Sequence, residues 1–399
     1  MRYFTVLTAG LLLASLRLGA ATTPMETPLP DEQTVTIECE YKPQKGDEAI
    51  VAYAGTGEDP KKAKEAVFHY NVYIPKGYGE NKERRFPCMF IASSTGNADM
   101  AQMRERLTHD RWLVVMLAES KNDSPEWLRN FVAAHDDAVS RLRILEDMKF
   151  GAGLAGGARC CSVWPEARKG FRGLFMQAAG FAGAAQAKDV PKQNPSLLFY
   201  ATFGATDGNL HDTANFRSLP PTTARYITVF EGGSEWAPAK VASQAFDWFE
   251  KKIFLESRTD PKLKDAYLWY VENLITRLDA DKTPLEQFEL CEHLQMAAKQ
   301  HGLASQENIK TKLEACKDQL AKLEKDEALR KELVARKAYQ ALEASEDTPL
   351  NAVVKPKGMS LSVLSTEYTK LAKIYTGTVY GSKAEQRATS INAEIGKKK

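Results

Sequence analysis

The sequence has no excess of charge of either sign. Its 399 residues carry 54 Lys and Arg against 52 Asp and Glu, which gives a formal net charge of +2. Proteins that bind nucleic acid or anionic membranes through their overall field need a larger positive balance. We therefore expect no nucleic-acid partner, and the three lysines at 397–399 are interpreted as a solvated tail.

Cysteine is also scarce, and its spacing matches no zinc-binding pattern. No phosphate-binding loop occurs either, so we expect neither a metal nor a cofactor. The six cysteines are interpreted as buried free thiols, with a disulfide between Cys291 and Cys316 as the alternative.

One long apolar run stands at the N-terminus, from Phe4 to about Leu16, after Arg2 and before a group of small residues. This pattern is typical of a secretory signal peptide, with cleavage expected after Ala21. The run is too short to remain as a membrane anchor. We expect a signal peptide at 1–21 and an exported protein, periplasmic or extracellular, with no membrane anchor after cleavage.

Between residues 22 and 256, apolar runs of strand length alternate with segments of helical periodicity. Such runs include 86–92, 112–118, 197–203 and 226–230. Strands that alternate with helices predict an α/β domain with a mainly parallel sheet and helices on both faces. Functional residues of such a sheet gather at the carboxyl ends of the strands.

From residue 257 to 399 the composition shifts to Lys, Glu, Ala and Leu, and no strand pattern remains. We expect an all-α bundle or hairpin domain that could hold a protein partner. Thr283-Pro284-Leu285-Glu286 predicts a helix start with a capping box. The pattern then predicts a long helix at about 305–344, a linker at 349–358 and a final helix pair at 361–395.

The most informative stretch is Gly153-Leu154-Ala155-Gly156-Gly157, between an apolar strand and a helix-compatible segment. It has the form of the G-x-S-x-G nucleophile elbow, in which glycines allow a strained backbone and close packing. The serine is missing, because Ala155 occupies the centre. A methyl group has no lone pair, so this site could bind a ligand but could not form an acyl intermediate.

Together with three other motifs, this stretch resembles the α/β hydrolases, more narrowly the exported esterase-like branch related to feruloyl esterases and polyhydroxybutyrate depolymerases. The resemblance covers about residues 67–254. Its motifs follow the family order: strand and turn at 73–78, elbow at 153–159, acid loop at 204–209 and histidine loop at 231–238. It implies an α/β-hydrolase-like sheet in the first domain.

Carried over position by position, the resemblance places the nucleophile on Ala155, the acid on Asp207 and the base on Ser234. Only the acid is retained. A serine hydroxyl cannot replace the histidine, because it does not take up a proton near neutral pH. We therefore expect no catalytic residues at these three positions.

Other side chains are expected near the mouth of the cleft. The candidate binding residues are Ser93, Ser94, Gly96, Trp127, Leu154, Gly156, His211 and Trp236, and the segment 119–122 borders the same edge. His69 is interpreted as a hydrogen-bonded histidine of the sheet. His135 is interpreted as part of a surface ion pair with the aspartates that follow it.

Three functional hypotheses follow. The first is a non-catalytic pseudohydrolase that binds a small ester-like or glycan-derived ligand, or a protein partner through residues 257–399. The second is an active serine esterase with a relocated nucleophile, Ser93 or Ser94, together with His211 and Asp207. The third is a scaffold protein that acts through its helical C-terminal domain.

Overall fold

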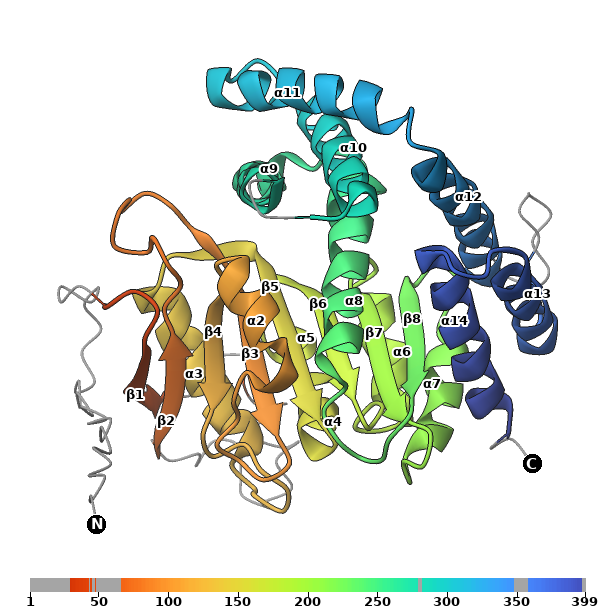
Figure 1. The fold of residues 1–399 in the computed structure, drawn as a ribbon. Helices are drawn as coiled ribbons and strands as arrows, with labels where there is room; N and C mark the ends of the chain where they lie inside the picture. Colours follow the sequence, from red (N-terminus) through yellow and green to blue (C-terminus); the bar gives the residue numbers. More distant parts are fainter. Residues whose placement is uncertain are drawn as a thin grey trace, which may run out of the picture.

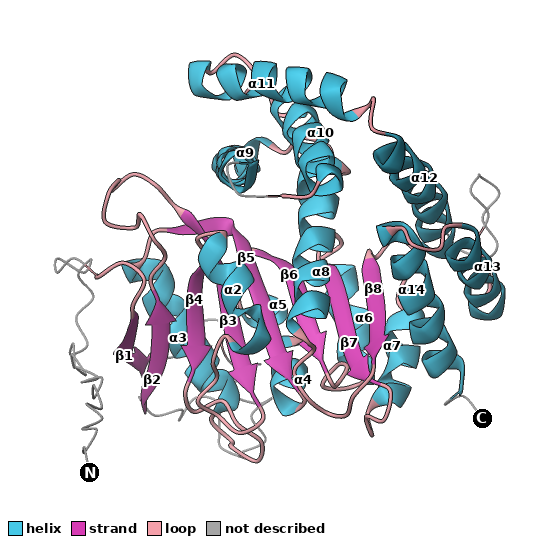
Figure 2. Ribbon diagram, in the orientation of Figure 1, coloured by secondary structure: helices cyan, strands magenta, loops and turns pink. Residues whose placement is uncertain are grey.

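The computed structural model describes residues 29–42, 44, 47, 66–278, 282–347 and 358–396. The expected signal peptide at 1–21 and nearly all of the expected linker at 349–358 lie outside these ranges. In the described part, a single layer of strands is covered by helices on both faces (Figures 1 and 2). No helix of the described ranges combines the length and the apolar character needed to cross a bilayer.

The sheet has eight strands in the order β1-β2-β4-β3-β5-β6-β7-β8. β2 runs antiparallel to both of its neighbours, whereas β4, β3 and β5 to β8 run parallel to one another. The strands are β1 (Thr34–Tyr41), β2 (Ala66–Tyr73), β3 (Phe86–Ser93), β4 (Leu113–Leu117), β5 (Ile144–Leu154), β6 (Phe171–Gln177), β7 (Leu198–Gly204) and β8 (Arg225–Phe230). This mainly parallel sheet, flanked by helices, is the α/β architecture that the sequence predicted for the first domain.

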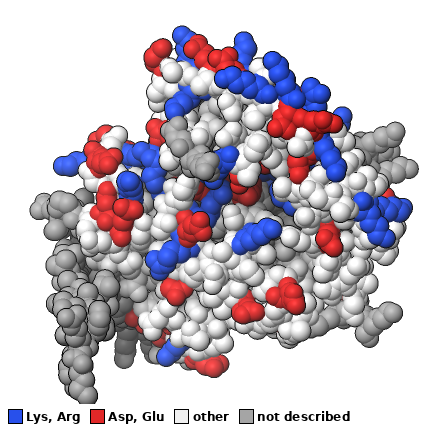
Figure 3. Space-filling view, in the orientation of Figure 1, with Lys and Arg blue, Asp and Glu red and all other residues white. Residues whose placement is uncertain are grey.

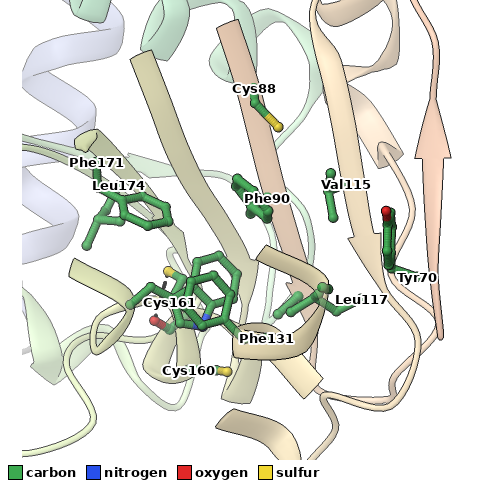
Figure 4. Close-up of a cluster of buried hydrophobic side chains, with 14 of the residues drawn as sticks. Tyr70, Cys88, Phe90, Val115, Leu117, Phe131, Cys160, Cys161, Phe171 and Leu174 are labelled. Carbon is green, nitrogen blue, oxygen red and sulfur yellow. Dashed lines mark hydrogen bonds between the residues drawn. The ribbon is translucent and has the colours of Figure 1, made fainter. Parts of the chain in front are cut away.

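Two hydrophobic clusters fill the space between the sheet and its helices. The helices of this half are α2 (Arg104–His109), α3 (Trp127–Arg141), α4 (Gly156–Cys161), α5 (Trp164–Ala167), α6 (Ala184–Gln193), α7 (Thr213–Arg217) and α8 (Ala239–Glu250). Figure 4 shows one cluster, in which Phe131 of α3 lies near Phe90 of β3 and the two thiols of α4. The central strands β3, β4 and β7 are buried along their whole length, as expected for strands covered on both faces.

In the described residues after 257, the regular elements are all helices, which confirms the second part of the predicted architecture. Its helices are α9 (Lys264–Leu278), α10 (Pro284–Gln300), α11 (Glu307–Leu323), α12 (Glu327–Asp347), α13 (Leu361–Ile374) and α14 (Val379–Gly396). The capping box before α10 forms as predicted, because the side chain of Thr283 accepts from the Glu286 N–H and the Glu286 carboxylate accepts from the Thr283 N–H.

The predicted single helix at 305–344 is instead two helices, α11 and α12, which meet at an angle (Figure 1). The break lies at 324–326, where the carboxylate of Asp326 accepts from the N–H of Leu329 and starts a new helix. The guanidinium of Arg330 also donates to the Glu324 carbonyl, an acceptor freed where α11 ends. These bonds replace those of a continuous helix.

The first helices of the C-terminal region share a core with the sheet. One hydrophobic cluster contains Phe150 of β5, Trp269 of α9 and Leu294 of α10, so no gap in packing marks the expected boundary at 256/257. The buried guanidinium of Arg277 adds ion pairs to Asp110 at 2.6 Å and Glu250 at 2.7 Å. Figure 1 shows α9, α10 and α11 beyond the amino ends of the strands, away from the edge where the elbow lies.

The last helix, α14, covers the exposed edge of the sheet at β8. The Ser390 hydroxyl accepts a hydrogen bond from the N–H of Val229 at 2.7 Å, and the Arg387 guanidinium donates to the Ile227 carbonyl. Both partners are main-chain groups of an edge strand that would otherwise be open to another strand. Arg387 is held in turn by the buried carboxylate of Glu346 on α12.

Candidate functional site

The backbone at Ala155 has the conformation of a nucleophile elbow. Ala155 follows β5 directly and has φ 52° and ψ −114°, a strained combination for a residue with a Cβ. Its N–H donates to the carbonyl of Gln177 at the end of β6, at 2.8 Å. The chain therefore keeps the sharp strand-to-helix turn although the residue at its tip has no nucleophilic atom.

The glycines around Ala155 are required by close packing, as the sequence predicted. A Cβ on Gly157 would lie 2.3 Å from the Ala92 carbonyl oxygen, and a Cβ on Gly153 would lie 2.2 Å from the Gly157 carbonyl carbon. The main chains of β3, β5 and α4 touch at this point. The turn is consequently fixed by backbone contacts that do not depend on Ala155.

The loops that carry the acid and base positions are bonded to each other. Both the N–H and the hydroxyl of Thr206 donate to the Gly232 carbonyl, at 2.9 and 2.8 Å. Asp207 is buried and accepts from the N–H of Asn209 at 2.9 Å, whereas Ser234 is exposed. Because β5, β7 and β8 run parallel, the structure brings Ala155, Asp207 and Ser234 to the same carboxyl edge.

Gln177 forms hydrogen bonds to two loops of this edge, and no sequence motif indicated this role. Its carbonyl accepts from Ala155, and its buried side-chain oxygen accepts from the N–H of Ala237 at 2.9 Å. The adjacent Trp236 is half-buried and packs against the core on the α8 side. Gln177 therefore links the elbow to the loop that carries the base position.

A pocket of about 230 Å³ opens beside the elbow. Its lining is formed by Ser120, Lys121, Asn122, Asp123, Trp127, Gly156, Arg159, Cys160 and Ala182. Trp127 and Gly156 were expected in the cleft, whereas Arg159 and Ala182 were missed as binding residues. Arg159 is held in place by Asp212 at 3.0 Å and by the Phe181 carbonyl at 3.2 Å.

The residues of the relocated-nucleophile hypothesis have other hydrogen-bond partners. Ser93 ends β3 beside Leu154, and its hydroxyl bonds to that of Thr95 at 3.1 Å. The His211 ring is largely exposed and contacts the Gly208 carbonyl at 3.0 Å and Asp212 at 3.5 Å. Among the hydrogen bonds of the described residues, none joins Ser93 or Ser94 to the His211 imidazole.

Two further histidines have structural positions. His69 on β2 bonds through Nδ1 to Glu119 at 2.8 Å, which fits the expected sheet histidine. The expectation of a surface ion pair at His135 is wrong, because this ring is buried against Phe90 and Phe171. His135 does bond to the adjacent Asp136 at 2.9 Å, but burial lowers the pKa of its imidazole to about 4.

No other nucleophile or metal centre stands out at this edge. Cys160 lines the pocket, yet burial raises the pKa of its thiol, so the reactive thiolate is scarce at neutral pH. All six cysteines are free and buried. In the part of the chain that the structure describes, no group of three His, Cys, Asp or Glu side chains is placed to hold a metal ion.

Several residues with a strained backbone lie at the carboxyl edge. Besides Ala155, positive φ angles occur at Asn97 (46°), Ala101 (43°), Asp123 (60°) and Ala178 (54°), in segments that follow β3, β4 or β6, whereas Glu32 and Arg111 have positive φ before β1 and β4. Each such residue costs about 1–3 kcal/mol and persists only where its surroundings enforce it. The loops of this edge therefore have shapes that their surroundings enforce, although Ala155 and Ser234 stand at the positions expected for a nucleophile and a base.

Comparisons with known proteins give distant structural matches. A ferulic acid esterase has 13% identity and a TM-score of 0.39, with 47% of this chain and 93% of that chain covered. The S-formylglutathione hydrolase FrmB from Staphylococcus aureus has 11% identity and a TM-score of 0.38, covering 55% of this chain and 98% of that chain. Est1E from Butyrivibrio proteoclasticus has 13% identity and a TM-score of 0.35, covering 47% and 95%. No protein-family model and no curated protein sequence matches the chain.

Proposed function

We propose that this chain is an exported, non-hydrolytic α/β-hydrolase-fold protein that binds a small ester-like or glycan-derived ligand at the carboxyl edge of its sheet. The observation that carries the proposal is Ala155, which has the backbone angles of an elbow and a methyl group at its tip. Ser234, at the position of the base, is the second departure.

The chemistry explains why these departures abolish hydrolysis. Acyl transfer requires a nucleophilic atom at the elbow and a group that takes its proton near neutral pH. Loss of the nucleophile or the base alone costs on the order of 10⁶ in turnover in a triad enzyme. Asp207 is retained, but an acid without an imidazole to orient has no catalytic role.

Binding is supported by what the edge has kept. The pocket beside the elbow has a size of about 230 Å³ and is lined by an indole ring, two cations and an amide. The strained loops around it stay in place at a cost in stability. Strained backbone lowers stability, so its presence around the pocket favours a binding function for this edge.

The decisive experiment is a hydrolysis assay on the purified mature protein with short 4-nitrophenyl esters, together with a fluorophosphonate probe. We expect no turnover above the Ala155→Gly variant and no labelled serine, while circular dichroism confirms a folded protein. Turnover that disappears on substitution of a cleft residue would overturn the proposal. Labelling of one serine would do the same.

The rival function is an esterase that uses Ser93 or Ser94 with His211 and Asp207. The same probe tests it, with Ser93→Ala and Ser94→Ala as variants and Ser218→Ala as an exposed control outside the cleft. The rival requires labelling that one cleft variant alone removes. Labelling equal in all three variants would place the reactive serine elsewhere.

A protein partner of the helical region, 257–399, is a further part of the proposal. Charged side chains of both signs crowd α11 and α12 on the face shown in Figure 3, which suits a polar protein surface and gives no single-sign field for nucleic acid. Because α9 and α10 share a core with the sheet, the interaction has to be tested with the whole chain.

A further inference from the structure

Lys121 stands between two depressions of the carboxyl edge. It lines the pocket of about 230 Å³ beside the elbow and also a second pocket of about 320 Å³. The second pocket is lined by Val67, Phe68, Thr95, Asn97, Ala118, Glu119, Lys121, Ser124 and Glu126. A ligand that filled both depressions would therefore cross the position of Lys121.

The main chain and stem of Lys121 are fixed in place. Lys121 forms an isolated β-bridge with Thr95, and the next residue donates its N–H to the Ser94 carbonyl at 2.9 Å. The stem passes over Gly96, where an added Cβ would lie 3.4 Å from the Cβ of Lys121 and 2.8 Å from the Ala118 carbonyl oxygen. The β4–α3 loop thus holds the base of this side chain at a fixed position beside Gly96, from which the ammonium group can reach both pockets.

Most other charges around the two pockets are neutralised by neighbours. Arg159 is paired with Asp212 at 3.0 Å, and Glu126 with Arg129 at 3.2 Å. Glu119 is paired with the His69 ring at 2.8 Å and also accepts the His69 N–H.

Two lining charges have no such partner. In the described ranges, neither Lys121 nor Asp123 takes part in an ion pair, and Asp123 lines the first pocket only. Lys121 is thus the charge available to a ligand that spans both pockets.

The two depressions offer apolar surface on either side of this cation. The first has Trp127 and Ala182 on its walls, and the second has Val67, which is 55% exposed, and Phe68. An exposed valine at a pocket mouth is a ready contact for an apolar ligand group.

We propose that this edge binds an elongated organic anion, with its negative group on Lys121 and one apolar arm in each depression. The inference rests on the proposed binding function and narrows its ligand class. It commits to a singly charged carboxylate or sulfonate, because among the described lining residues Lys121 is the one cation without an ion-pair partner and a single ammonium matches a single negative charge.

The test uses two fluorescent probes that differ only in charge. 8-Anilinonaphthalene-1-sulfonate has two aromatic arms beside a sulfonate, and N-phenyl-1-naphthylamine lacks the sulfonate. With Lys121→Gln, we expect the dissociation constant of the sulfonate to rise about fivefold, while that of the neutral probe stays within about twofold. Lys121→Arg should restore most of the sulfonate affinity, because it keeps the charge.

Substitution of Asp123 should change the affinity for the sulfonate in the opposite direction to substitution of Lys121. Asp123→Asn removes a like charge and should tighten sulfonate binding by about twofold to threefold without affecting the neutral probe. Lys192→Gln on α6, an exposed lysine outside both pockets, is the matched control and should change neither constant. An equal loss in Lys121→Gln and Lys192→Gln, or equal affinity of the wild type for both probes, would overturn the assignment.

A second set of variants tests whether one ligand fills both pockets at the same time. Ala182→Phe fills the first pocket and Val67→Ser removes apolar surface from the second, so each should weaken both probes by at least about threefold. Val139→Ser, at an exposed apolar position of α3 outside the pockets, is the control. If only one of the two wall variants weakens binding, the ligand does not span the edge and this inference fails. The proposed function would still stand in that case, provided that the protein neither hydrolyses 4-nitrophenyl esters nor reacts with the fluorophosphonate probe.

Discussion

The side-chain oxygen of Asn122 lies 1.6 Å from the point that a Cβ on Gly156 would occupy. The β4–α3 loop therefore lies directly against the residue that follows the elbow tip. In active α/β hydrolases, the N–H of that residue helps to bind the oxyanion. Under the proposed function, Asn122 is thus a third residue of this edge, besides Ala155 and Ser234, whose effect on hydrolysis can be tested.

This contact predicts unequal effects of alanine at two neighbouring glycines. Gly156→Ala meets the end of a side chain, which can rotate away, so the free energy of unfolding should fall by less than about 1 kcal/mol. Gly157→Ala meets the Ala92 carbonyl at 2.3 Å and should cost about 3 kcal/mol or more. Urea denaturation of both variants checks the contrast, and equal costs would contradict it.

Restoring the triad is expected to need three substitutions. Ala155→Ser with Ser234→His supplies nucleophile and base, but the Asn122 side chain still lies against the Cβ side of Gly156, the residue after the tip. We expect little ester hydrolysis from this double variant and at least about tenfold more when Asn122→Ala is added. The measurement is turnover of 4-nitrophenyl acetate, with Asn122→Ala alone as control. Full activity in the double variant would show that Asn122 leaves the oxyanion position open.

The strain at the elbow predicts a stabilising substitution. Ala155→Gly removes the Cβ from a backbone with φ 52° and should raise the free energy of unfolding by about 1 kcal/mol, since the relief exceeds the added entropy of the unfolded glycine. Ala158→Gly, inside α4 and fully buried, should instead destabilise by about 1 kcal/mol or more. Thermal denaturation distinguishes them, and two shifts of the same sign would refute the argument.

Burial of His135 predicts a pH dependence of stability. The folded pKa is about 4, below the value near 6.5 of an unfolded histidine, so the unfolded state binds the proton more readily between these values. Stability from this group is complete above about pH 6.5 and is lost as the pH falls toward 4, by about 3 kcal/mol at most.

The measurement for His135 is a difference between variants. His135→Asn should flatten the fall of the free energy of unfolding over this range, although it lowers stability at neutral pH. His211→Asn, at a ring that is 72% exposed, is the control and should leave the slope unchanged. The same acid slope in wild type and His135→Asn would rule out the assignment.

Features encoded by residue type at short range were predictable. Glycine is the residue that permits main chains to touch, so Gly153 and Gly157 marked the elbow correctly. The capping box at Thr283 and Glu286 is likewise a contact within one turn of helix. The mainly parallel sheet with helices on both faces followed from the alternation of strands and helices along the chain.

Features that depend on distant partners were not predictable. His135 is buried by Phe90 and Phe171 from two other elements, so its own helix gave no sign of it. The break between α11 and α12 falls among good helix formers, where Asp326 was indistinguishable from a surface residue. The segment 119–122 was expected to border the cleft, but the position of Lys121 between two pockets depends on where the β4–α3 loop lies relative to Gly96 and the elbow.

The hydroxyl of Ser390 and the guanidinium of Arg387 occupy main-chain groups at the outer side of β8. With these two side chains in place, the Val229 N–H and the Ile227 carbonyl are not available to pair with a further strand at this end of the described sheet. Loss of α14 would leave β8 as an uncovered edge strand that can pair with a strand of another molecule.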